Sequence, residues 1–184
     1  SSGKVNLFTR PRRFGKTLNM SMLRYFFENT DEDNSYLFKN LNISKAGDKY
    51  LSHMGQYPVI SLSLKSMKQN NFEDAFKIFK QIIADEFERH SKIHKKLSTS
   101  KQKQFLDFCK QTADDSEYLY SLHALSHCLE SAYEKRVIIL IDEYDVPLES
   151  AYFNGYYDEM VNLIRSVFES ALKTNDSIEF AVLT

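Results

Sequence analysis

A run of five aliphatic residues followed at once by two acids is the feature that most restricts how this chain can fold. Residues 137–141 read VIILI, and Asp142 and Glu143 follow them. A continuous rather than alternating apolar run is expected of a parallel strand that is buried on both faces. Adjacent acids must lie at the solvent or ligand end of such a strand, because an unpaired buried carboxylate is costly. The run therefore predicts a central strand that presents two carboxylates at its carboxyl end.

Strand and helix patterns alternate along the rest of the chain. Further strands are predicted at residues 5–9, 58–64 and 178–183. Helices are predicted at residues 16–29, 72–90, 117–133 and 156–173, and a further helix follows a polar break at 98–100 and runs to about residue 110. Right-handed crossovers between such elements give an α/β fold, a mostly parallel sheet with helices on both faces. We expect ligand chemistry at the carboxyl ends of the strands.

Side-chain spacing predicts which helix faces are packed and which residues cap the helices. Residues Leu18, Met22, Tyr25 and Phe26 are expected on the packed face of the first helix, and the aromatic residues at 25–27 and 76–87 are expected in the core. Residues 114–116 offer an N-cap for the helix at 117–133, and Asp145 offers one for a helix after the acidic pair.

Composition describes an ordinary globular chain. The 184 residues are 42% hydrophobic, with only three prolines and five glycines, which excludes disorder and low-complexity linkers. The two cysteines have neither metal-ligand spacing nor the density of a disulfide scaffold, so a reducing compartment, the cytoplasm, is expected. No aliphatic run approaches the roughly 20 residues that cross a bilayer, so no membrane partner is expected. Residues 1–184 are interpreted as one domain with a helical insertion at about 65–135.

Charge is nearly balanced overall but unevenly distributed. The net charge of −1 argues against a protein that coats nucleic acid. Residues 1–24 contain six bases and no acid, whereas residues 142–159 contain six acids and no base. One part of the chain can therefore hold an anion and the other a cation. A further basic block at 89–103 lacks interleaved aromatic residues and is interpreted as a solvated helix end and loop.

The loop after the first strand carries a phosphate-binding pattern. Residues 10–17, RPRRFGKT, match seven of the eight positions of G-x-x-x-x-G-K-[ST]. Backbone N–H groups around Gly15 would face a phosphate, Lys16 would reach its β and γ oxygens, and Thr17 would ligate magnesium. The exception is Arg10, which stands where the first glycine is usual. A helix N-terminus preceded by a basic loop is the alternative interpretation.

The predicted nucleotide contacts extend over the loop and the first helical turn. They are Arg12, Arg13, Phe14, Gly15, Lys16, Thr17 and Leu18. Pro11 stiffens the entry of the loop beside Arg10. The arginines at 12 and 13 either add positive charge toward the phosphates or face a partner.

The acidic pair completes the candidate site. Asp142 is predicted to hold Mg²⁺ through its water shell, together with Thr17. Glu143 is predicted to polarise the attacking water, so Glu143 and Lys16 are the candidate catalytic residues. The alternative is a strand that simply meets a polar loop, and the Gly-Lys-Thr step about 125 residues earlier disfavours it. The five histidines lie apart from any Cys or Asp pair at ligand spacing, and His90 and His94, taken as the i, i+4 pair, lack a third ligand within their helix, so zinc is not expected.

The segments FTRPRRFGKTLNMSMLRYFF (8–27) and VIILIDEYDVPL (137–148) together resemble a bacterial family of predicted AAA-ATPase-like proteins. Members of that family are typically fused to a carboxy-terminal PD-(D/E)XK nuclease-like domain. An arginine at the first-glycine position looks like a usual feature of the family. The resemblance implies an ASCE-type P-loop fold that binds ATP and Mg²⁺. It assigns the phosphate and metal roles to Lys16, Thr17 and Asp142 and the role of base to Glu143.

The resemblance also bears on the end of the chain and on partners. Thr184 ends the last predicted strand, where related nucleotidases keep a polar residue near the γ-phosphate. A core of this kind usually has a fifth strand, so we expect the chain to be the amino-terminal part of a longer protein that lacks its last strand here. An attached nuclease-like domain, nucleic acid and a protein are the partners that follow.

The sequence is compatible with two functions of different classes. The first is a Mg²⁺-dependent ATPase whose nucleotide state controls a partner or an attached effector domain. The second is a degenerate P-loop module for binding or scaffolding, in which the basic loop at 10–13 contacts nucleic acid or protein without hydrolysis. A kinase is disfavoured because Glu143 directly after Asp142 suits water activation, and guanine specificity is disfavoured because no N-K-x-D occurs.

Overall fold

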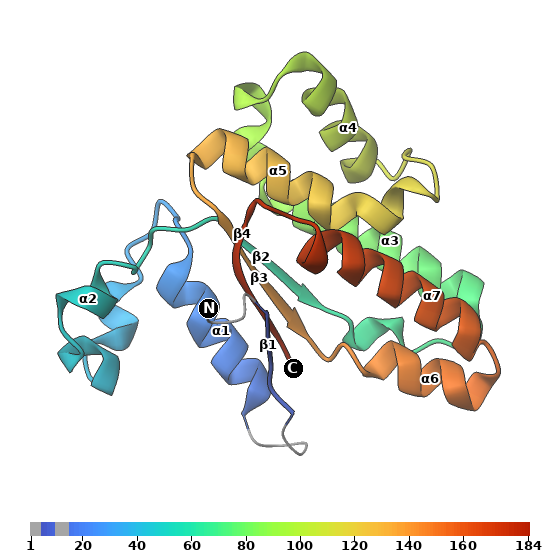
Figure 1. Cartoon of the computed structure of the whole chain (residues 1–184), viewed down its shortest axis with the longest axis horizontal. Coiled ribbons are helices and arrows are strands. Elements are labelled where there is room, and N and C mark those ends of the chain that lie inside the picture. Colours follow the sequence, from blue (N-terminus) through green and yellow to red (C-terminus); the bar gives the residue numbers. More distant parts are fainter. Residues whose placement is uncertain (1–4, 10–14) are drawn as a thin grey trace.

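A four-stranded parallel sheet forms the centre of the computed structural model, which describes residues 5–9 and 15–184. The strands are β1 (Val5–Leu7), β2 (Val59–Ser63), β3 (Val137–Asp142) and β4 (Ile178–Leu183), in the order β1-β4-β3-β2 (Figure 1). All neighbouring strands in this order are parallel. The predicted α/β fold is therefore confirmed, and β4 separates the strand before the phosphate-binding pattern from the strand that carries the acids.

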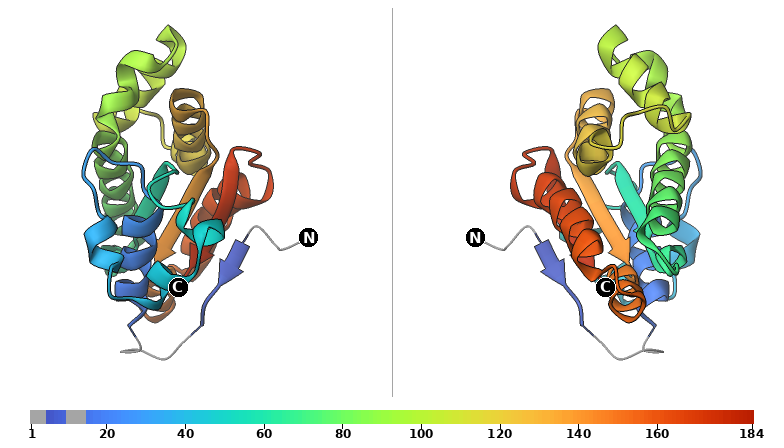
Figure 2. Two further views of the ribbon diagram at one scale, coloured as in Figure 1. Left: turned by 90° about the vertical axis from the view of Figure 1, so that its left-hand side faces the viewer. Right: turned by 90° about the vertical axis from the view of Figure 1, so that its right-hand side faces the viewer.

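Helices connect the strands and cover both faces of the sheet. They are α1 (Lys16–Phe27), α2 (Asp48–Leu51), α3 (Phe72–Arg89), α4 (Thr99–Cys109), α5 (Ser121–Tyr133), α6 (Val146–Asn154) and α7 (Tyr157–Phe168). Shorter 3-10 turns lie at Ser35–Phe38, Asn42–Lys45, Lys65–Met67, Ser91–Lys96 and Glu117–Tyr120, and a π-helical turn lies at Glu169–Lys173. Figure 2 shows α1 on one side of the sheet and α7 on the other.

Strand β3 has the burial that its sequence predicts. Its five aliphatic residues are completely buried, and β2 and β4 flank it. Because side chains alternate along a strand, Val137, Ile139 and Ile141 enter the larger core with α3, α5 and α7. Ile138 and Leu140 pack on the other face with Met20 of α1. Burial on both faces explains why the run is continuous.

The structure corrects the predicted packed face of α1. Leu18 and Tyr25 are 65% and 44% exposed, whereas Met20, Leu23 and Phe27 contact the sheet. The helix therefore docks on a face rotated from the one that we expected. Segment 30–57, for which no element was predicted, forms short helical turns beside it, and Phe38 packs edge-to-face on Phe26 with ring centroids 5.3 Å apart.

Three further local predictions are also corrected. The helix expected at 117–133 begins as a 3-10 turn and becomes α-helical only at Ser121, and no side chain caps either piece. Asp145 occupies the N-cap position of α6, but its side chain makes no capping hydrogen bond. Arg89, assigned to a solvated block, instead joins a largely buried ion network with Glu28 and Glu86. The other predicted strands and helices agree with the structure to within a few residues.

Candidate functional site

Three polar residues lie next to one another at the carboxyl edge of the sheet. The strand register pairs Ser63 of β2 with Asp142 of β3, and it pairs Leu183 with Ile141, so Thr184 follows beside Asp142. The Thr184 hydroxyl donates a hydrogen bond of 2.5 Å to Asp142 Oδ1, and the backbone N–H of Glu143 donates one of 3.0 Å to the same oxygen. The carboxylate of Asp142 is thereby held in one orientation at 5% exposure.

The second oxygen of Asp142 is the one left for a cation. No described residue hydrogen-bonds to Asp142 Oδ2, and Asp142 and Thr17 line the same cavity of about 200 Å³ between α1 and β2. Ser61 and Ser63 also line it. Carboxylate and hydroxyl oxygens are the ligands that Mg²⁺ prefers, usually together with several waters. The residues present therefore fit a Mg²⁺ ion between Thr17 and Asp142.

The start of α1 offers backbone donors to an anion. Gly15 is the N-cap residue, no side chain caps the helix, and its first turn contains no acid. The N–H groups of Lys16, Thr17 and Leu18 consequently have no partner within the helix. Gly15 has a φ of 72°, and a Cβ added there would meet nothing within 4 Å, so its backbone angle rather than lack of space favours glycine.

Glu143 borders the same cavity as the phosphate-loop residues. Its φ of 54° is left-handed, which is uncommon for a residue with a side chain and is found mainly at sites where the surroundings enforce it. A cavity of about 890 Å³ is lined by Gly15, Lys16 and Thr17 as well as by Glu143. Leu18 lines it too, with an exposed side chain, so any contact with an anion would come from its backbone.

Two lysines at this cavity were missed by the sequence reasoning. Lys65 and Lys68 follow β2 and line the same cavity as the start of α1. Neither forms an ion pair with any described residue. Because the carboxyl ends of parallel strands meet at one edge, the rule that located Asp142 could also have indicated these lysines and Ser63.

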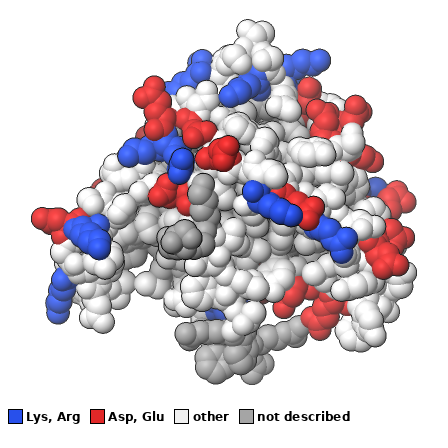
Figure 3. Space-filling view, viewed as in Figure 1, with Lys and Arg blue, Asp and Glu red and all other residues white. Residues whose placement is uncertain are grey.

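Acidic residues surround the other rim of the cavity. Asp145 and Glu149 line it, and Figure 3 shows Asp and Glu side chains gathered over α6 and the start of α7, at the lower right. The cavity thus carries both signs of charge, with lysines from α1 and the segment after β2 and carboxylates from the end of β3 and from α6. Lysine ammonium groups can bind the oxygens of a phosphate chain.

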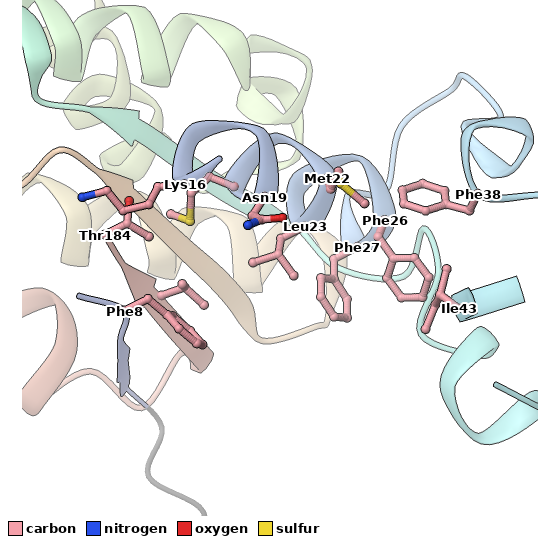
Figure 4. A pocket seen from close by; sticks show the side chains of 12 residues that line it. Phe8, Lys16, Asn19, Met22, Leu23, Phe26, Phe27, Phe38, Ile43 and Thr184 are labelled. Atoms are coloured by element: carbon pink, nitrogen blue, oxygen red, sulfur yellow. The ribbon is translucent and has the colours of Figure 1, made fainter. Parts of the chain in front are cut away.

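A third cavity extends from this site along α1. Its volume is about 460 Å³, and Lys16, Asn19 and Thr184 lie toward one end of it (Figure 4). The remainder is lined mainly by apolar side chains of α1 and its neighbours, including Phe26 and Phe38. It supplies no further charged group for phosphate chemistry.

The remaining predicted contacts lie outside the described residues. These are Arg12, Arg13 and Phe14, together with Arg10 and Pro11, so their roles stay predictions. In the part of the chain that is described, no three or more His, Cys, Asp or Glu side chains are grouped as a metal site. Over residues 5–9 and 15–184, no helix has both the length and the apolar character to span a bilayer.

Comparison with known proteins gives one match. A family model described as "Predicted AAA-ATPase" matches residues 1–184. No curated protein and no solved structure matches the chain. The match covers the strands, the start of α1 and the acidic pair from which the site is built.

Proposed function

Because the chain belongs to the predicted AAA-ATPase family, we propose that it binds ATP with Mg²⁺ at the carboxyl edge of the sheet and hydrolyses it. The nucleotide state would then control a partner protein or an attached effector domain. The effector that the family resemblance implies is a nuclease-like domain acting on nucleic acid.

One observation carries this proposal. The Gly15-Lys16-Thr17 step and Glu143, which are far apart in sequence, border a single cavity. Asp142, the neighbour of Glu143, borders the adjoining cavity with Thr17. The residues proposed to bind phosphate, to ligate Mg²⁺ and to act as base therefore border two cavities that share Thr17. This grouping supports the proposal over the alternative of a bare helix N-terminus.

Each residue has a distinct task in the proposed reaction. The N–H groups at the start of α1 and the Lys16 ammonium would hold the β and γ phosphate oxygens. Thr17 and Asp142 would hold the Mg²⁺ ion, which neutralises charge that develops on the phosphates. Glu143 would accept a proton from the attacking water. Lys65 and Lys68 would add positive charge to the cavity.

Binding of ATP to a Lys16→Ala variant tests the nucleotide site. Loss of a charge-assisted contact worth about 1.5–3 kcal/mol should weaken Mg-ATP binding by roughly 10- to 150-fold. Isothermal titration calorimetry measures the affinity, and Lys39→Ala, which changes a lysine that borders none of the three cavities described here, is the matched control. Equal ATP affinity of a folded Lys16→Ala protein and the wild type would refute the proposed phosphate site.

Hydrolysis is tested separately through Glu143→Gln. The amide keeps the shape of the side chain but cannot accept a proton, so kcat should fall by about 10²- to 10⁴-fold while ATP affinity is retained. Turnover is measured by phosphate release from the full-length protein. An unchanged rate would remove Glu143 as the base. A wild-type protein that binds no ATP would favour the scaffolding alternative, which Arg10 at the first-glycine position supports.

A further inference from the structure

Two histidines on successive turns of α5 bring their ring nitrogens together, away from the candidate nucleotide site. The Nε2 atoms of His123 and His127 lie 3.2 Å apart. Ser177, which contacts this pair, directly precedes β4, whereas Thr184 follows β4. The pair and the nucleotide site therefore lie at opposite ends of one strand, and Figure 1 shows α5 at the end of the sheet away from the start of α1.

A chain of hydrogen bonds fixes the proton of His127. The Ser177 hydroxyl donates a hydrogen bond of 2.5 Å to Glu130 Oε2. That hydroxyl has only one proton, so in its 3.1 Å contact with His127 Nδ1 the ring N–H must be the donor. A neutral His127 consequently carries its proton on Nδ1 and presents the bare lone pair of Nε2 to His123.

We propose that His123 and His127 bind a divalent transition-metal ion of the Zn²⁺ class through their Nε2 atoms, with Ser177 and Glu130 orienting His127. Two Zn–N bonds of about 2.0–2.1 Å at a tetrahedral angle place the nitrogens roughly 3.3 Å apart, close to the observed spacing. Histidines that ligate metals ordinarily donate their other N–H to an oxygen, as His127 does to Ser177.

The free state of the pair suits such a ligand set. Without metal, His123 donates its Nε2–H to His127 Nε2. Metal binding requires the other neutral tautomer of His123, in which the proton lies on Nδ1 and the Nε2 lone pair is free for the metal. The described residues provide no third His, Cys, Asp or Glu ligand. Both rings are partly exposed, so water completes the coordination.

Calorimetric titration of ZnCl₂ into the protein tests the site. The buffer contains excess MgCl₂, which occupies oxygen-ligand sites such as the one at Asp142 but does not compete for imidazole. We expect one Zn²⁺ per chain, bound at least tenfold more weakly by His123→Gln and by His127→Gln. His53→Gln, which changes an exposed histidine paired with Tyr57, should bind Zn²⁺ as the wild type does. A Zn²⁺ affinity of either pair variant equal to that of the wild type would overturn the proposal. Absence of Zn²⁺ binding by the wild type would also overturn it.

A measurement on the wild type guards against variants that fail to fold. Addition of ZnCl₂ should shift the ring resonances of His123 and His127 in NMR spectra and leave those of His53 in place. Shifts confined to other histidines would also overturn the proposal. The site does not depend on the proposed ATPase function, because Lys16→Ala should lose ATP binding while its Zn²⁺ affinity is unchanged.

Discussion

Replacing Arg89 by alanine tests whether a buried ion network ties α1 and α3 to the sheet. The guanidinium of Arg89 pairs with Glu28 at the end of α1, binds Glu86 through Nε at 2.9 Å and Nη2 at 2.6 Å, and donates to the carbonyl of Val59 in β2. Glu86 also accepts the N–H of Ser61 at 2.7 Å. Both glutamates are nearly inaccessible, at 6% and 5% exposure.

The magnitude follows from what the substitution leaves behind. Arg89→Ala removes the cation that two buried carboxylates share, but Glu28 keeps its 2.8 Å ion pair with Arg24. The loss therefore falls mainly on Glu86, and breaking a buried pair in this way costs about 3–5 kcal/mol. For a chain of this size, each kcal/mol lowers Tm by about 2–4 °C, so we expect a loss of roughly 6–20 °C. Arg89→Lys keeps the charge but cannot reproduce the forked contacts, and its loss should be smaller.

The pH dependence of this loss has a definite sign. Burial alone would raise the pKa of Glu86, but hydrogen bonds from Arg89 and His90 outweigh it and hold the pKa below its ordinary value of 4.5. In the wild type, the resulting stability is present above pH 4.5 and is lost as pH falls through the lowered pKa. Without Arg89, burial dominates, and the folded variant binds a proton at higher pH. The difference in the free energy of unfolding between the wild type and Arg89→Ala should therefore be smaller at pH 5 than at pH 7.

Urea unfolding followed by circular dichroism at pH 7 and pH 5 measures both effects. Lys77→Ala is the control, because Lys77 pairs with Glu73 on the exposed face of the same helix and should change stability little. The reasoning fails if the free energy of unfolding of Arg89→Ala at pH 7 is within about 1 kcal/mol of that of the wild type. The network would then stabilise the fold no more than a surface ion pair does. It also fails if the difference in the free energy of unfolding between the two proteins is larger at pH 5 than at pH 7.

Two further predictions concern single buried groups. Thr184→Val should lower the free energy of unfolding by about 1.5–3 kcal/mol, because Asp142 loses a hydrogen-bond donor. Thr112→Val, which removes an exposed hydroxyl bonded to Asp107, should have no such effect. Urea unfolding of the two variants measures the difference. Burial raises the pKa of the Cys128 thiol to about 11 and leaves it 2% exposed, so iodoacetamide at pH 8 should modify Cys128 only after unfolding, as mass spectrometry of the native and denatured protein would show. Rapid labelling of native Cys128 would contradict the described packing.

The sequence predicted the parts of the fold that have a strong period. The continuous run at 137–141 indicated a strand buried on both faces, and the apolar spacing of residues 76, 79, 83 and 87 indicated the packed face of α3, on which Phe76 is only partly buried. The face of α1 was predicted wrongly, because Leu18 and Tyr25 fit a helical stripe just as well as the residues that contact the sheet. Periodicity finds a helix, but it cannot choose between two apolar stripes when the partner surface is unknown.

The site could be predicted only where a local pattern marks it. The Gly-Lys-Thr step and the acidic pair are local patterns, and they lie at the start of α1 and the end of β3 as expected, while their chemical roles stay predictions. The sequence reasoning took His90 and His94 as the i, i+4 histidine pair and missed His123 and His127 on α5. Their spacing is local, but their arrangement depends on Ser177, which is 50 residues away in sequence. The Arg89 network has no local signal at all, because Glu28, Glu86 and Arg89 meet only once α1 and α3 are docked.

Glu143 shows how the backbone completes what the strand pattern cannot. Asp142 has the same parity along β3 as Ile138 and Leu140, so its side chain lies on the α1 face, toward Thr17. An extended continuation would send Glu143 to the opposite face, away from the start of α1. The left-handed φ of 54° breaks the alternation at this residue, and Glu143 borders the cavity with Lys16 instead. A glycine would adopt that angle without strain, so a glutamate at this position is what we expect if the proposed reaction requires its carboxylate there.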